Sequence, residues 1–290
     1  MLTSDKLLMA GQSGDTVGIA WDLATVSNTS IDSATSQFGF DADSLQYSRG
    51  GNYQYRVADV TTNTLVYSQI LFSPWDLRNR DDQNEFGSWV IPGYTQLTWK
   101  QDGYSFFLSG YSGNSFTMTK LETPFQWESE FGNITQTYSV DLGTALYGGS
   151  HVSYDGTEII VNTDTKFHKI TMTTPYDLST ASLTQTSAAN VVARVGSVQV
   201  RSDGKKIVTS DAFFTYANNV PTFYQYDLST AWDLSTISLD VTKTITTPTT
   251  ADLMTALYFS DSERYFIFHT KQSAGVPFTD GLNHYYEHTY

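Results

Sequence analysis

A hairpin phrase that recurs along the whole chain most constrains its fold. Two alternating apolar runs flank a tight turn, and this phrase returns about every 50 residues. Asp-Gly or Gly-Gly between such runs favours a type I′ hairpin, because both central residues of that turn need positive φ. The turns begin at residues 5, 50, 102, 155, 203 and 261. Three of them carry the full pair: Asp102 and Gly103, Asp155 and Gly156, and Asp203 and Gly204.

A second landmark, an aromatic residue followed by Asp and Leu, comes after the hairpin in most units. The Asp, Ser and Thr side chains of this motif can hydrogen bond to their own backbone and so turn the chain. The aromatic side chain is then left to pack on a neighbouring unit. We expect the motif to end one strand and begin the next. Its aromatic and acidic residues are Trp21 and Asp22, Trp75 and Asp76, Tyr176 and Asp177, Tyr226 and Asp227, and Trp232 and Asp233.

The fifth unit contains this motif twice, in the stretch YQYDLSTAWDLSTIS of residues 224–238. The spacing to the next turn is also the longest in the chain. We interpret the second copy as an insertion that duplicates the turn at the end of the strand.

These landmarks predict an all-β fold. Each unit offers four short strands, and no helical periodicity of useful length appears. Four strands in about 50 residues, repeated about six times, are typical of a β-propeller. We therefore predict a single propeller domain over residues 1–290 with about six four-stranded blades, leaving five or seven blades open. A β-sandwich is the alternative, but it does not require the same phrase in every unit.

The last unit stops after its third strand, at HYYEHTY of residues 284–290. We expect an incomplete last blade that the start of the chain does not close. An uncovered strand edge can pair with another chain. A homo-oligomer, or a chain docked on a symmetric assembly, is the expected setting.

Composition excludes several partners. The chain has 30 acidic and 16 basic residues, a net charge of −14, which is the wrong sign for nucleic acid. It has no cysteine, so neither a disulfide nor a thiolate metal site is available. No stretch resembles a signal peptide core or a membrane span, so no membrane insertion is expected. No cofactor or metal is predicted.

Motifs of known enzymes are present in unsuitable contexts. His284, Glu287 and His288 fit an H-x-x-E-H zinc pattern, but that pattern needs a helix and these residues lie in an expected strand. The loop of residues 11–15 (GQSGD) faintly resembles a nucleophilic serine loop, without an assigned base. A glycosidase would need carboxylates that converge in the channel. Acids that the repeat does not explain are Asp81, Asp82, Glu85, Glu128 and Glu130.

The stretch TSDKLLMAGQSGDTVGIAWDLAT resembles a WD-repeat, and "YDLSTAWDLSTIS" and "TPYDLSTAS" with "SDGKK" resemble degenerate propeller repeats in structural proteins of marine tailed bacteriophages. This resemblance implies a non-enzymatic virion protein, a tail, fibre or surface-decoration component that acts as an interaction scaffold. Its implied location is the virion, and its implied partners are other virion proteins and host glycans.

Recognition on such a scaffold is expected in the loops that vary between units. The loops at residues 110–116 and 211–222 carry the candidate binding residues Tyr111, Phe213, Phe214 and Tyr216, whose rings suit stacking on sugars. Two alternatives to the virion protein therefore stay open: a carbohydrate-binding propeller of the lectin type, and a propeller glycosidase.

Overall fold

The structure is a computed structural model, and it describes residues 24, 32–35, 44–47, 53–60, 63–70, 94–100, 104–110, 115–120, 134–143, 146–163, 165–188, 195–211, 222–245, 253–259, 265–271 and 282–287. Within these ranges the chain consists of β-strands, turns and short 3-10 segments. No helix in these ranges is long and apolar enough to cross a membrane. The prediction of an all-β chain is confirmed.

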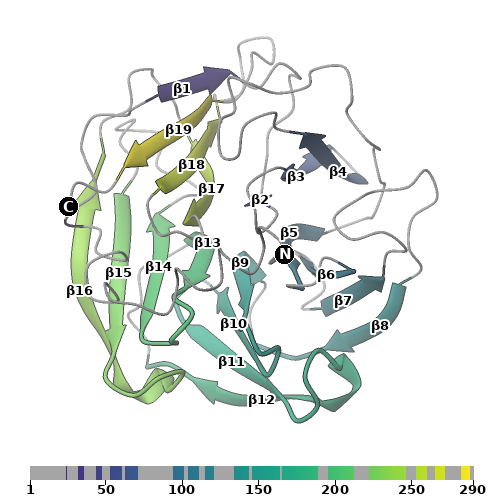
Figure 1. Ribbon diagram of the computed structural model, residues 1–290. Coiled ribbons are helices and arrows are strands. Elements are labelled where there is room, and N and C mark those ends of the chain that lie inside the picture. Colours follow the sequence, from purple (N-terminus) through teal and green to yellow (C-terminus); the bar gives the residue numbers. More distant parts are fainter. Residues whose placement is uncertain are drawn as a thin grey trace, which may run out of the picture.

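The described strands form five antiparallel sheets, which stand around a common centre like the blades of a propeller (Figure 1). One sheet has three strands: β2 (Ser44–Tyr47), β3 (Tyr53–Val60) and β4 (Asn63–Ile70). The next contains β5 (Tyr94–Trp99), β6 (Ser105–Gly110), β7 (Ser115–Lys120) and β8 (Ile134–Ser139). It is followed by β9 (Leu146–Val152), β10 (Glu158–Thr163), β11 (Phe167–Met172) and β12 (Ala181–Thr186).

The fourth sheet contains β13 (Val195–Val200), β14 (Lys206–Asp211), β15 (Thr222–Leu228) and β16 (Ile237–Thr244). The last combines β17 (Leu253–Phe259), β18 (Tyr265–Lys271) and β19 (Leu282–Glu287) with β1 (Asp32–Thr35). The propeller-like fold agrees with the prediction. Six four-stranded blades are not what the described residues form, since they contain four sheets of four strands and one of three.

Strand β1 closes the ring. It pairs antiparallel with β19, with Asp32 opposite Tyr285 and Thr35 opposite Leu282. Nearby, the Nζ of Lys243 on β16 donates to the carbonyl of Ala24, 3.4 Å away and 219 residues earlier in the chain. The expectation of an incomplete last blade is therefore wrong: a strand from early in the chain provides its outermost position. The reason for expecting an oligomer disappears with the open edge, and oligomeric state stays a prediction.

The Asp-Gly turns are longer than predicted. The Ser153 amide donates to the Glu158 carbonyl and the Gly156 amide to the Ser153 carbonyl, at 2.8 and 2.9 Å, so four residues form the loop. Only the glycine has positive φ, +72° at Gly156, whereas a type I′ turn would require it at Asp155 as well. The predicted hairpin is confirmed at this place and its turn type is corrected.

The aromatic-Asp-Leu motif turns the chain as expected. Asp177 caps the 3-10 helix η2 (Leu178–Thr180), accepting from the amide and hydroxyl of Ser179 at 3.0 and 2.6 Å. These hydrogen bonds hold the pKa of Asp177 below its usual value. Asp233 caps η3 (Leu234–Thr236) in the same way. The preceding outer strands hold both helices, since Gln136 accepts from the Leu178 amide at 2.7 Å and Gln185 from the Leu234 amide at 2.8 Å.

The doubled motif is not an insertion. Trp232 and Asp233 match Tyr176 and Asp177, whereas Tyr226 and Asp227 are ordinary residues of strand β15. Asp227 binds the Nζ of Lys206 at 2.6 Å instead of capping a helix. The extra length of this unit lies between β14 and β15, where residues 212–221 replace the short connection of residues 164–166 between β10 and β11.

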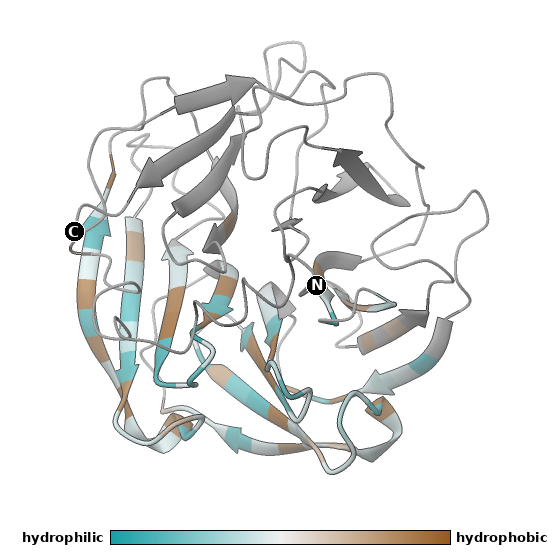
Figure 2. Cartoon of the chain, in the orientation of Figure 1, coloured by the Kyte–Doolittle hydropathy of each residue, from teal (hydrophilic) through white to brown (hydrophobic). Residues whose placement is uncertain are grey.

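The core lies between the sheets. Along β10, Ile159 and Val161 belong to a buried cluster with Phe107 of the preceding sheet, while Ile160 belongs to another with Val198 of the next. Hydrophobic positions recur along β10 and its neighbours (Figure 2). Because both faces of β10 are covered, its apolar residues Ile159, Ile160 and Val161 follow one another instead of alternating with polar ones.

Buried polar residues occupy one repeated position of the second strands. The first paired residues of the second strands are Phe106, Ile159 and Ile207. Three residues further along these strands lie Ser109, Asn162 and Ser210, all at most 2% exposed. Ser109 receives a hydrogen bond from Ser150 of the next sheet at 3.0 Å. The residue equivalent to Ser150 is Val198 one sheet further on, and no hydrogen bond reaches either side-chain atom of Asn162 or the hydroxyl of Ser210.

We expect this difference to separate two serine variants. Ser109→Ala leaves the buried Ser150 hydroxyl without its partner and should lower the free energy of unfolding by about 1–2 kcal/mol. Ser210→Ala removes a buried hydroxyl that has no partner, so it should be neutral or stabilise by up to about 1 kcal/mol. Urea unfolding measures both, and equal losses in the two variants would contradict this account.

His168 makes stability depend on pH. It is 3% exposed, and its ring nitrogens lie 3.0 Å from the Thr163 hydroxyl and 3.1 Å from the Thr186 hydroxyl. Burial, and then the charge of Lys166, lowers its pKa from 6.5 to about 4. The unfolded chain therefore takes up a proton at a higher pH than the folded one. The resulting stability is complete above pH 6.5 and is lost as pH falls toward 4.

The thermal midpoint of the wild type should therefore decrease as the pH is lowered from 7 to 4.5, and that of His168→Gln should decrease less. A residual slope is expected from His151, whose pKa burial also lowers to about 4 against a hydrogen bond with Gln199. Parallel pH curves for wild type and His168→Gln would show that His168 does not contribute.

Candidate functional site

Most residues that the sequence singled out for function lie outside the described ranges. This applies to the binding residues Tyr111, Phe213, Phe214 and Tyr216, which stay predictions, and to the acids considered for a glycosidase. It also applies to the repeat residues Trp21, Asp22, Trp75, Asp76, Asp102 and Gly103.

His284 and Glu287 of the H-x-x-E-H pattern lie on a strand, and His288 lies outside the described residues. His284 lies in β19, opposite Ser33 of β1 and Phe268 of β18. Residues four apart on a strand are about 13 Å apart, too far to bind one metal ion together. In the part of the chain that the structure describes, no three His, Asp or Glu residues gather in a way that could hold a metal.

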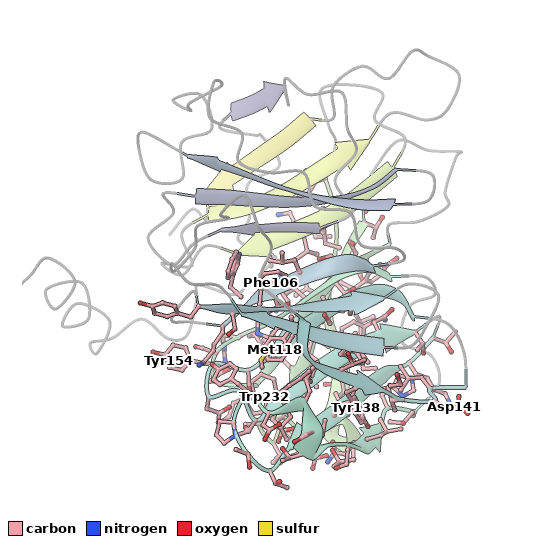
Figure 3. The ribbon with its side chains drawn as sticks, turned by 90° about the vertical axis from the view of Figure 1, so that its right-hand side faces the viewer. Phe106, Met118, Tyr138, Asp141, Tyr154 and Trp232 are labelled. Atoms are coloured by element: carbon pink, nitrogen blue, oxygen red, sulfur yellow. The ribbon has the colours of Figure 1, made fainter. Side chains whose placement is uncertain are left out.

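Two tyrosines on the hairpin turns of neighbouring sheets stand out among the exposed residues that the structure describes. Tyr104 follows the β5–β6 turn and is 43% exposed, and Tyr154 lies in the β9–β10 turn and is 53% exposed. Figure 3 shows Tyr154 at one face of the ring, with Asp141 near the opposite face. The other exposed large apolar residues in the described ranges, Leu183 and Leu239, lie on outer strands.

Tyr176 packs against the turn that carries Tyr154 and hydrogen bonds to it. Its amide donates to the Gly156 carbonyl at 2.8 Å, and its hydroxyl donates to the Tyr154 carbonyl. The Nζ of Lys100, from the preceding sheet, lies 5.1 Å from the centroid of its ring. We call Lys100, Tyr104, Tyr154 and Tyr176 the tyrosine cluster, to which Tyr104 belongs by its place at the hairpin turn of the neighbouring sheet and the others by their contacts. It joins two sheets on the face that carries the Asp-Gly turns.

The carboxylate of Asp155, next to Tyr154, accepts hydrogen bonds from residues of its own turn. One oxygen of Asp155 accepts from the Ser153 hydroxyl at 2.7 Å and from the amide and hydroxyl of Thr157 at 3.0 and 2.8 Å. Burial raises the pKa of Asp155, but these hydrogen bonds outweigh it and the net pKa is lowered. Asp155 is thus a turn residue, as the sequence predicted.

The turn does not need a tyrosine at position 154. In the next sheet Ser202 takes the same place, and there Asp203 is held by Arg201, with an Nη2 to Oδ2 distance of 2.6 Å. In the preceding sheet the corresponding residue is Gln101. The same turn thus forms with Ser202, so the exposed ring of Tyr154 is a departure from the repeat.

Sequence reasoning missed the tyrosine cluster because it sought recognition in the most variable loops. The available signal was the single aromatic residue at a turn position that is otherwise polar: Gln101, Tyr154 and Ser202. Tyr104 gave no comparable signal, since the apolar run of β6 begins beside it.

Comparison with known proteins gives a likeness of fold. No protein-family model matches the chain, and no curated protein matches it. A solved structure of a functionally unknown protein from Desulfotomaculum acetoxidans has 12% identity, with 80% of this chain and 68% of that one covered and a TM-score of 0.45. A proposed 6-phosphogluconolactonase from Bacteroides uniformis has 13% identity, 88% and 74% coverage and a TM-score of 0.46.

A second proposed 6-phosphogluconolactonase, from Bacteroides fragilis, has 14% identity, 83% and 65% coverage and a TM-score of 0.40. Two of these three proteins carry the name of a proposed enzyme and none that of a virion component, so the expectations of a non-enzymatic chain and of a virion structural role are withdrawn. At such identities the likeness concerns the fold alone: the chain is similar to proteins with a propeller-like β-fold.

Proposed function

We propose that the protein binds carbohydrate through the tyrosine cluster. The observation that carries this proposal is Tyr154, whose ring is 53% exposed on a turn that uses only its backbone carbonyl. Tyrosine offers a flat apolar face for the C–H face of a sugar ring and a hydroxyl for its polar edge.

The ordered turn that carries Tyr154 favours binding. Tyr154 sits in a turn closed by backbone hydrogen bonds and by Asp155, so little order has to be gained when a ligand binds. Only 16% of the residues of the chain are charged. A chain with few charges suits a neutral polyhydroxylated ligand better than a charged one.

Calorimetric titration with maltopentaose, cellopentaose, mannopentaose and xylopentaose tests the proposal. We expect at least one of these to bind, and Tyr154→Ala to weaken that binding by about tenfold or more, with a smaller loss for Tyr104→Ala. Leu239→Ala is the matched control, because Leu239 has the same exposed fraction, 53%, on an outer strand. Equal affinities in Tyr154→Ala and wild type would refute the proposal.

The same preparations are to be assayed for hydrolysis of the bound pentasaccharide and of 6-phosphogluconolactone. Turnover that Tyr154→Ala reduces would make the tyrosine cluster part of an enzyme's substrate site. Binding without turnover would leave it a recognition site alone.

A further inference from the structure

Four units carry the Asp-Leu motif at the turn expected after the third strand, and the aromatic residue before it differs in one of these four. It is tryptophan at Trp21, Trp75 and Trp232, but tyrosine at Tyr176. The unit with the tyrosine is also the unit whose hairpin turn carries the exposed Tyr154.

The backbone does not explain this difference. Tyr176 and Trp232 have φ of 58° and 59°, and their amides donate to Gly156 and Gly204 at 2.8 and 2.9 Å. Each ring covers the glycine of its turn so closely that a Cβ there would lie 2.3 Å from the Tyr176 ring or 2.1 Å from that of Trp232. Either aromatic residue therefore satisfies the fold.

What tryptophan lacks is a hydroxyl at the far end of the ring. The Tyr176 hydroxyl reaches beyond the glycine to the carbonyl of Tyr154, whereas the indole nitrogen of Trp232 lies over Gly204 itself. The ring of Tyr176 also contacts the preceding sheet, since Phe107 stacks on it with centroids 6.2 Å apart and the Nζ of Lys100 lies 5.1 Å from its centroid.

We propose that Tyr176 is the positioning residue of the carbohydrate site. Its hydroxyl fixes the backbone that presents Tyr154, and its ring holds this turn against the sheet that carries Tyr104. The assignment rests on the proposed function and adds that the side chain beneath the turn controls affinity.

Three variants test the assignment. Tyr176→Phe removes only the hydroxyl, Tyr176→Trp installs the residue used at position 232, and Trp232→Tyr is the matched control in the next sheet. All are measured by thermal unfolding, by amide hydrogen exchange over residues 153–157, and by titration with the pentasaccharide that the wild type binds best. We expect the thermal midpoint of Tyr176→Phe to stay near that of the wild type.

Both changes at Tyr176 should speed amide exchange in the turn and weaken binding about threefold to tenfold, and Trp232→Tyr should change neither. If Tyr154→Ala abolishes binding while Tyr176→Phe keeps wild-type exchange and affinity, the positioning role is wrong and the proposed function stands. If Tyr154→Ala binds like the wild type, the proposed function is wrong and the role of Tyr176 in it is lost as well.

Discussion

Gly204→Ala should lower the free energy of unfolding by about 3 kcal/mol. Gly204 has φ of +70°, where an L-residue costs roughly 1–2 kcal/mol. Its added Cβ would also lie 2.1 Å from Nε1 of Trp232, so the indole ring or the turn would have to move. Urea unfolding monitored by tryptophan fluorescence measures this loss.

Two comparisons separate the causes. Gly143 has a similar φ, +75°, but no atom lies within 4 Å of its Cβ position, so Gly143→Ala should cost only about 1 kcal/mol. In a Trp232→Ala background the ring is absent, and Gly204→Ala should fall to the same small cost. If Gly143→Ala and Gly204→Ala were equally damaging, packing of the ring over the turn would not be the cause.

Gly149→Ala should lower the free energy of unfolding by about 2–3 kcal/mol for a different reason. A Cβ on Gly149 would lie 2.4 Å from the amide nitrogen of Val198 and 2.9 Å from the Cα of Ser197. These are backbone atoms of β13, the innermost strand of the next sheet, so the two sheets would have to separate. Alanine is otherwise favoured over glycine in a strand by roughly 0.5–1 kcal/mol, which makes a loss diagnostic.

Val198→Ala tests whether the contact is with backbone. If the clash is with the amide of Val198, shortening that side chain cannot relieve it, and the losses of Gly149→Ala and Val198→Ala should add in the double variant. A double variant more stable than Gly149→Ala alone would show that the side chain was the obstacle.

The parts of the fold that sequence predicted rest on contacts within a few residues. Asp155 hydrogen bonds to Thr157, and Asp177 to Ser179, two positions further on. Such contacts form wherever the short phrase occurs, so hairpins and caps could be recognised by their repetition. The turn type was missed because it depends on the conformation of Asp155, which the Asp-Gly pair alone does not specify.

The candidate site was less accessible to sequence. Tyr154 could be noticed as an exception to the repeat, but its support by Tyr176 joins residues 22 positions apart, and Lys100 comes from another sheet. The expectation of a virion role rested on the resemblance of the repeat motifs, whose residues build turns. Those motifs carry the scaffold and say little about what binds to it.

The sequence by itself determined that this chain is all-β, where many of its hairpins turn, and that an aromatic-Asp-Leu motif caps a turn, because each of these depends on neighbouring residues. Which of the two copies in residues 224–238 forms the cap, Asp233 and not Asp227, was decided by the structure. Only the tertiary structure decided how the ring closes, since β1 and β19 are far apart in the chain and the sequence of neither strand indicates that the two pair. It alone also shows that a side chain on Gly149 would meet the next sheet and that the Tyr176 hydroxyl reaches the turn of Tyr154. Both contacts involve atoms that folding brings together, the amide of Val198 and the carbonyl of Tyr154.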